Sequence, residues 1–251
     1  MLGLIVSDVV GDDLDVIASG PTVPDPSTFA DCLRVVEHYG LRWKMPQSIW
    51  AHIEGGLQGR TPETPKADEP AFGRVRNVLV ASVKQALEGA ADEAARCGFV
   101  PRILTTAMSG EARRTAAQLV AEARRAQAGL RPGDAPLCLL AGGETTVTIQ
   151  GSGKGGRNQE MALAATLELA DDRGIDLICV GTDGTDGPTD AAGGYAFSGD
   201  LARLRAIGLH PKESLDANDS YPLLLKAGTL LRTGPTRTNV MDMAIMLVRP
   251  K

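Results

Sequence analysis

Residues 151–160, GSGKGGRNQE, set two cations beside a glycine-rich backbone where a helix is predicted to begin. Backbone N–H groups at a helix N-terminus attract anions. Lys154 and Arg157 add positive charge, and a guanidinium binds carboxylate or phosphate through two parallel hydrogen bonds. We therefore predict that this stretch binds substrate or phosphate through Gly153, Lys154, Gly155, Gly156, Arg157 and Asn158. A flexible connection would use the same glycines in residues 151–156, the glycine loop, so that interpretation stays open.

The glycine loop also satisfies G-x-G-x-x-G between a strand predicted at residues 145–149 and the helix. This is the context of a dinucleotide fingerprint, so an NAD enzyme is an alternative. The fingerprint also needs an acid after the next strand to hold the ribose, but Asp176 precedes that strand and Asp183 comes late. A Walker phosphate loop has the pattern G-x-x-x-x-G-K-[ST]. It is excluded, because no glycine of this loop is followed, after four residues, by Gly-Lys and then Ser or Thr.

Carboxylates gather in residues 181–194, GTDGTDGPTDAAGG, directly after an apolar predicted strand. Open α/β sheets place ligands at the carboxyl ends of strands, and carboxylate oxygens suit Mg²⁺. A second acidic loop, residues 7–13, follows the first predicted strand. From these loops we predict the magnesium ligands Asp183, Asp186 and Asp8. Turn chemistry also explains Asp-Gly pairs, so a purely structural role is the alternative.

Two further loops carry polar groups, GGETT at residues 142–146 and TGPTRTN at residues 233–239. We assign Glu144 and Arg237 in these loops to substrate or phosphate binding, although loop solubility would explain both.

The three histidines lie outside the glycine-rich and acidic motifs, and no G-x-S-x-G elbow occurs. Nucleophilic catalysis therefore has little support.

The elements that position these groups alternate between short apolar runs and alanine-rich amphipathic segments, which predicts an α/β fold with mixed or largely parallel sheets and flanking helices. Strands are predicted at residues 2–6, 78–82, 102–106, 137–143, 145–149, 177–183 and 244–248, and helices at residues 81–97, 110–128 and 158–170. A helix N-cap is predicted near Ser27. Proline, glycine and charge predict an exposed loop at residues 55–70 and a domain seam at residues 128–137, between domains 1–130 and 136–251.

The charge balance favours a small-molecule partner. The net charge of −5 argues against nucleic acid or an anionic membrane surface, both of which favour a basic face. The four cysteines, Cys32, Cys97, Cys138 and Cys179, form no C-x-x-C pair, which predicts reduced thiols and a cytoplasmic location. No signal peptide or spanning segment is predicted at the amino terminus.

Three segments together resemble the carboxyl-terminal MOFRL domain of the glycerate 2-kinase family, also catalogued as hydroxypyruvate reductase. They are LAGGETTVTIQGSGKGGRNQEMALA, GTDGTDGPTDAAGG and NDSYPLLLKAGTLLRTGPTRTNVMDMAIML, within residues 136–248. Upstream, LIVSDVVGDDLDVIASGPTVPDPSTFADCL is similar to the later part of that family's amino-terminal domain. The resemblance implies a partial Rossmann-like domain followed by a MOFRL domain.

The resemblance further implies transfer of the ATP γ-phosphoryl group to the 2-hydroxyl of D-glycerate, with Mg²⁺, in a cleft between two domains. Arg157 matches the arginine of the family motif G-G-R-N-Q-E and would be the catalytic residue. Family members are longer, and their Ser-Gly-Gly-Gly loop and lysine have no counterpart here, so an amino-terminally truncated member is expected. Exposed strand edges would favour a homodimer. An NAD(P)H-dependent hydroxypyruvate reductase and a non-catalytic remnant that binds a carboxylated metabolite are the alternatives.

Overall fold

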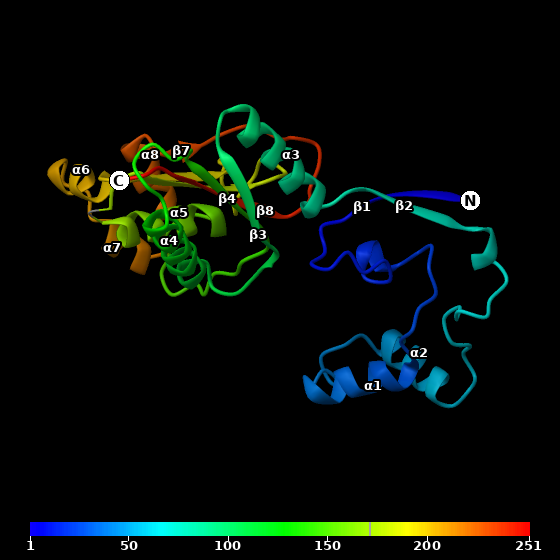
Figure 1. Ribbon diagram of the computed structural model, residues 1–251. Coiled ribbons are helices and arrows are strands. Elements are labelled where there is room, and N and C mark those ends of the chain that lie inside the picture. Colours follow the sequence, from blue (N-terminus) through cyan, green and yellow to red (C-terminus); the bar gives the residue numbers. More distant parts are fainter. Residues whose placement is uncertain (171) are drawn as a thin grey trace. The chain divides into compact units, whose positions relative to one another are not determined.

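The computed structural model describes residues 1–170 and 172–251, which divide into two compact units (Figure 1). The smaller unit comprises Met1–Ile5 and Asp12–Val78, and the larger comprises Val6–Gly11 and Leu79–Lys251. Every residue that lines the candidate site belongs to the larger unit.

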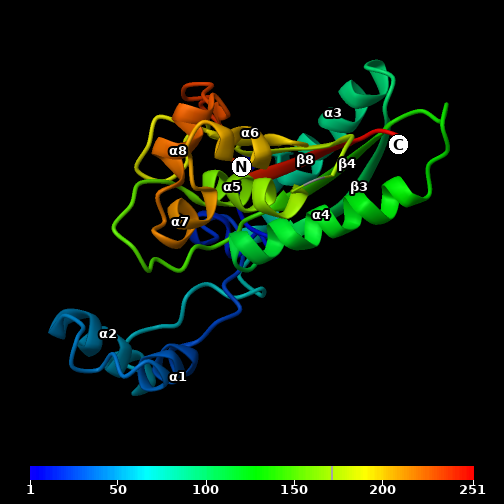
Figure 2. The same ribbon diagram turned by 90° about the vertical axis from the view of Figure 1, so that its left-hand side faces the viewer.

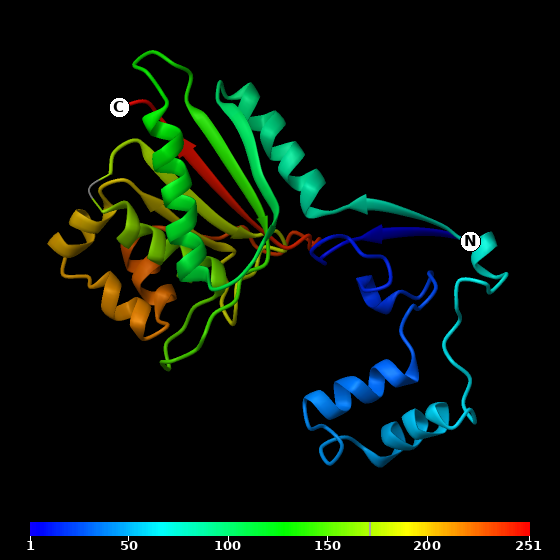
Figure 3. The ribbon, with the colours of Figure 1, turned by 60° about the horizontal axis from the view of Figure 1, so that its bottom comes forward.

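The smaller unit holds a pair of helices and most of a two-stranded sheet (Figure 3). Its elements are β1 (Leu2–Val6), the 3-10 helix η1 (Ile17–Ser19), α1 (Phe29–His38), α2 (Gln47–Leu57), the 3-10 helix η2 (Phe72–Arg74) and β2 (Arg76–Ala81). α1 begins with a capping box, in which the side chains of Thr28 and Asp31 each accept from the other's backbone N–H. The cap lies one residue after the predicted Ser27.

The larger unit is built on a mixed six-stranded sheet with the strand order β3-β4-β8-β5-β6-β7. The strands are β3 (Val100–Met108), β4 (Leu137–Gly143), β5 (Ile175–Gly181), β6 (Gly193–Phe197), β7 (Leu230–Leu231) and β8 (Asp242–Val248). β3 and β4 are parallel, and all other pairs are antiparallel. The mixed α/β prediction is therefore confirmed.

Helices cover both faces of this sheet, and Figure 2 shows α3 and α4 on opposite sides. The helices are α3 (Val83–Arg96), α4 (Ala112–Ala128), α5 (Arg157–Leu169), α6 (Asp200–Ala206), α7 (Pro211–Asp216) and α8 (Ser220–Ala227). β4 is buried along its whole length, and its side chains alternate between two cores. Leu139 packs in the core with α4 and α5, whereas Leu140 packs in the core with α3.

Two sequence predictions differ from the structure. The strand predicted at residues 145–149 is wrong, because only Thr146 forms an isolated bridge, with Glu111. The stretch at residues 128–137 joins α4 to β4 and lies wholly within the larger unit, so the compact units divide near Val78 instead. The assignment of two family domains to 1–130 and 136–251 stays a prediction.

No helix among the described residues is long and apolar enough to cross a membrane.

Candidate active site

The first turn of α5 is capped by a carboxylate of the chain itself. Asp186, which is 3% exposed, accepts from the backbone N–H of Asn158 at 3.1 Å and of Gln159 at 2.8 Å, and from both side-chain amides. Burial raises the pKa of Asp186, the hydrogen bonds from the two backbone N–H groups and the Gln159 side chain oppose that shift, and the charge of Asp242 adds to it. Asp186 therefore satisfies the N–H groups of the second and third residues of α5.

The glycine loop lies directly against the turn between α7 and α8. A Cβ at Gly151 would come within 2.2 Å of Ala217 O, and a Cβ at Gly153 within 2.5 Å of Asp219 Cβ. The backbone N–H of Gly153 donates to Ala217 O at 3.0 Å, and that of Lys154 donates to Asp219 Oδ1 at 2.8 Å. These glycines are therefore required by close packing, and part of the loop backbone is already hydrogen-bonded.

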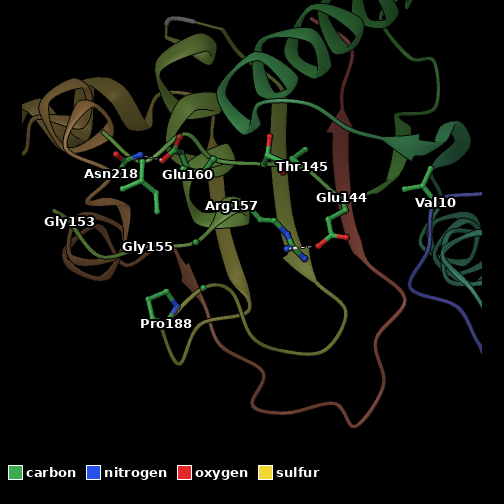
Figure 4. Close-up of a pocket in the computed structure, with 14 residues that line it drawn as sticks. Val10, Glu144, Thr145, Gly153, Gly155, Arg157, Glu160, Pro188 and Asn218 are labelled. Carbon is green, nitrogen blue, oxygen red and sulfur yellow. Dashed lines mark hydrogen bonds and ion pairs between the residues drawn. The ribbon is translucent and has the colours of Figure 1, made fainter. Parts of the chain in front are cut away.

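Three consecutive backbone N–H groups at the end of the glycine loop make no hydrogen bond to the described part of the chain. Within residues 1–170 and 172–251, the N–H groups of Gly155, Gly156 and Arg157 donate to no protein acceptor. The same three residues line a pocket of about 740 Å³, which Figure 4 shows with Glu144 and Glu160 on its wall. N–H groups at a helix start form an anion site when they are not otherwise satisfied.

Arg157 extends from this helix start into a double ion pair. Its Nε and Nη2 donate to the carboxylate of Asp242 at 2.5 and 3.1 Å, and its Nη1 lies 2.7 Å from Glu144 Oε1. Asp242 is fully buried at the start of β8, whereas Glu144 is 47% exposed. Burial opposes the charged guanidinium, but the hydrogen bonds and charge of Asp242 outweigh it and raise the pKa of Arg157. Arg157 is therefore a fixed cation on the pocket wall.

Two family models match the chain, one near each end. A model described as "MOFRL family" matches residues 137–242, and one described as "Domain of unknown function (DUF4147)" matches residues 1–54. A glycerate kinase from Macaca fascicularis is 36% identical over the whole chain, which covers 73% of that protein. The chain belongs to the glycerate kinase family. The resemblance inferred from its motifs is thereby confirmed.

Other members of the glycerate kinase family are similar along nearly the whole chain. A glycerate 2-kinase from Pyrococcus horikoshii is 46% identical over 99% of the chain, and a D-glycerate 2-kinase from Thermotoga maritima is 43% identical over 99%. The crystal structure of a Thermotoga maritima glycerate kinase superposes with a TM-score of 0.86 at 42% identity, covering 99% of this chain and 57% of that one. The chain spans 56% of the length of each of the first two relatives.

In this glycerate kinase family member, the predicted anion-binding residues are only partly brought together. Gly153, Gly155, Gly156, Arg157 and Glu144 all line the pocket.

The other three predicted binding residues lie elsewhere. The Lys154 ammonium sits 4.7 Å from the centre of the Tyr221 ring, and Lys154 is absent from the pocket lining. Asn158 is buried, and its side chain donates to Asp186. Arg237 is exposed in the loop before β8 and does not line the pocket.

The predicted magnesium ligands do not converge. Asp186 directs both carboxylate oxygens at α5, and Asp183 accepts from the N–H and hydroxyl of Thr185 at 2.8 Å each. Asp8 is exposed in the loop after β1. Across the described residues, no group of three His, Cys, Asp or Glu side chains could hold a metal ion. The turn chemistry that was the alternative for the acidic loop accounts for the contacts of Asp183 with Thr185, whereas Asp186 caps α5.

Sequence reasoning missed Asp242, which fixes Arg157, and Asn218, whose side chain binds the start of the glycine loop. Asp242 had one local signal, since it is an acid at the beginning of the apolar strand 242–248. Asn218 had none, because its partners lie 58 to 70 residues away along the chain.

Proposed function

We propose that the chain takes part in transfer of the γ-phosphoryl group of ATP to the 2-hydroxyl of D-glycerate. The observation that carries this proposal is that one pocket is lined by Arg157 and by Gly155 and Gly156, whose backbone N–H groups are unsatisfied within the described residues. Phosphoryl transfer depends chiefly on positioning and on charge stabilisation, and both kinds of donor supply it. The named activities of the family members support the same reaction.

In this proposal, Arg157 binds the phosphoryl group or the glycerate carboxylate. Asp242 already occupies Nε and Nη2, so the guanidinium cannot turn away from the pocket without breaking a buried pair. Glu144 occupies Nη1 from the more exposed side. An incoming anion would compete with Glu144 and leave Asp242 in place. Anion binding therefore requires movement of one half-exposed carboxylate.

No set of carboxylates among residues 1–170 and 172–251 fits the predicted Mg²⁺. The oxygens of Asp186 are engaged by four donors, and Asp183 and Asp8 do not join a group of three possible ligands among the described residues. The requirement for Mg²⁺ with ATP stays a prediction. The chemistry assigned to this chain rests on its N–H groups and on Arg157.

A hydroxypyruvate reductase finds less support. Its dinucleotide fingerprint requires a strand before the glycine loop, and residues 145–149 form only one bridge. The N–H groups of Asn158 and Gln159, which would face a pyrophosphate, are taken by Asp186. A glycerate-binding remnant without turnover, a homodimer and a cytoplasmic location also stay predictions, as do the absence of nucleic-acid and membrane partners.

A product assay tests the proposed reaction. The 251-residue chain is incubated with ATP, Mg²⁺ and D-glycerate, and ³¹P NMR follows ADP and 2-phosphoglycerate. We expect both products to rise together. A parallel sample with hydroxypyruvate and NADH should show no loss of the NADH absorbance. Binding of ATP and glycerate without product would favour the remnant, and NADH oxidation would favour the reductase, so either result contradicts the proposal.

A further inference from the structure

Asn218 uses every hydrogen-bonding position of its side chain in the turn between α7 and α8. Oδ1 accepts from the backbone N–H of Gln150 at 2.7 Å and of Gly151 at 2.9 Å. Nδ2 donates to Glu160 Oε2 at 2.9 Å and, more weakly, to Thr148 O at 3.4 Å. The residue is 7% exposed and lines the same pocket as Arg157. One buried amide thus joins the start of the glycine loop to α5 (Figure 4).

Glu160 is in turn held from the opposite side. Arg113 on α4 donates its Nε to Glu160 Oε1 at 2.6 Å and its Nη2 to Leu215 O at 2.6 Å. Glu160 is 3% exposed, so its carboxylate would be costly to bury without these partners. The chain of contacts Arg113, Glu160, Asn218 therefore fixes the direction of the Asn218 amide.

The backbone conformation at Asn218 is one that glycine would adopt with less strain. Its φ is +53°, in the left-handed region that glycine adopts at the lowest cost and asparagine tolerates. A turn that needed only this conformation would favour glycine. The side chain accordingly contributes something that the turn does not require, and its contacts lead to the glycine loop.

We propose that Asn218 is a positioning residue, which with Glu160 anchors the start of the glycine loop and so sets the N–H groups of Gly155, Gly156 and Arg157 for an anionic substrate. This inference rests on the proposed function only for the nature of the ligand. The anchoring can be measured without any ligand.

The chemistry of the pair gives a specific test, because Asn218 and Glu160 can exchange roles. In Asn218→Asp, a second carboxylate would face Glu160 Oε2 with no donor between them, and the loop should detach. Adding Glu160→Gln restores the donor, because the introduced amide can donate its N–H to the introduced carboxylate while its carbonyl oxygen accepts from Arg113 Nε. The double variant has the same net charge as the wild type.

Hydrogen–deuterium exchange on the whole 251-residue chain measures the anchoring, and calorimetric titration with ATP measures its consequence. We expect the hydrogen-bonded amides of residues 150, 151, 153 and 154 to exchange at least about tenfold faster in Asn218→Asp. ATP affinity should fall by a similar factor, since about 1.4 kcal/mol corresponds to tenfold. In the double variant, both the exchange rate of these amides and the ATP affinity should return most of the way to their wild-type values. Asn218→Gly keeps the turn conformation and removes the amide, so it should also loosen the loop if the aspartate variant folds poorly.

A pH series distinguishes positioning from general destabilisation. In Asn218→Asp, a proton shared between the carboxylates at positions 160 and 218 would replace the lost donor, so ATP affinity should partly recover as pH falls from about 8 to about 6. The charged groups around the pair are Arg113 on α4, Asp216 on α7, which lies 3.8 Å from Arg113 Nη1, and Glu111, whose charge acts on Arg113 and which accepts from Thr148 N–H. These groups are present in the wild type and the double variant, which should show no such recovery.

Lys212→Ala, an exposed change on α7 that breaks only the pair with Asp216, is the control. Unchanged exchange at residues 150, 151, 153 and 154 in both Asn218 variants would overturn the inference, whatever the activity. Faster exchange with unaltered ATP affinity would overturn the link to the anion site. If the wild type binds no ATP, the proposed function fails in this chain, and the exchange data alone decide whether Asn218 anchors the loop.

Discussion

Arg157 is the residue whose role follows most directly from its neighbours. A cation at the start of a helix opposes the helix dipole, so its presence there needs a compensating anion. The structure provides two, the buried Asp242 and the half-exposed Glu144. The sequence predicted an anion-binding arginine from its place at a helix start beside a glycine-rich backbone. It did not predict Asp242, because a pairing across 85 residues leaves no periodic or local pattern.

The four cysteines allow a prediction at this scale. Cys138 and Cys179 are buried, and burial raises the pKa of both thiols, so they stay protonated and inaccessible. Cys32 and Cys97 are exposed. We expect two thiols to react quickly with a chromogenic disulfide reagent in the native protein, and four after unfolding. Rapid reaction of a third thiol without unfolding would show that the sheet core opens to the reagent.

At the scale of elements, apolar periodicity predicted the strands better than the connections. β1 and β4 match their predicted bounds, because short apolar runs carry a strong strand signal, although only β4 is buried and β1 is largely exposed. Residues 145–149 have the same composition, but the chain leaves the sheet at Gly143, where φ is +146° and a Cβ would meet Met108 O at 2.2 Å. Thr146 then pairs with the start of α4 instead. Where the chain leaves a sheet depends on tertiary contacts, which the composition of a segment does not reveal.

The cap of α5 gives a pH-dependent prediction. The pKa of Asp186 is raised in the folded protein, mainly by burial, so its titration contributes stability that is complete below the unfolded value near 3.8 and is lost as pH rises through the folded pKa. Asp186→Asn should lower the free energy of unfolding by about 1–3 kcal/mol at about pH 7, through the lost cap. Urea unfolding measures this difference from wild type, which should grow as pH falls toward about 4.

Asp190 provides a control of opposite sign for the Asp186 prediction. The hydroxyl of Tyr221 lowers the pKa of Asp190, and Arg232 adds to that shift. Its contribution is therefore present above the unfolded pKa and is lost as pH falls through the folded one. Any effect of Asp190→Asn on urea unfolding should shrink on acidification. Parallel pH trends in the two variants would contradict the assignment of Asp186.

At the scale of the whole molecule, the sequence predicted the α/β class and the family but not where the compact units divide. The stretch at residues 128–137 has the proline, glycine and charge of a linker, yet it only turns the chain from α4 into β4. β3 precedes this stretch in the sequence and pairs in parallel with β4, which follows it, so both strands belong to the same sheet. Loop composition indicates an exposed turn, whereas a domain boundary is set by which strands pair.

The measurement that tests the account most directly compares turnover in two arginine variants. Arg157→Ala removes the cation of the pocket, and Arg203→Ala breaks a similar pair with the buried Asp200 outside it. We predict that kcat for phosphoglycerate formation falls by about 10²–10³-fold in Arg157→Ala, the size expected for loss of one donor to the transition state, and changes less than about twofold in Arg203→Ala. Equal losses in both folded variants, or full turnover without Arg157, would contradict the account.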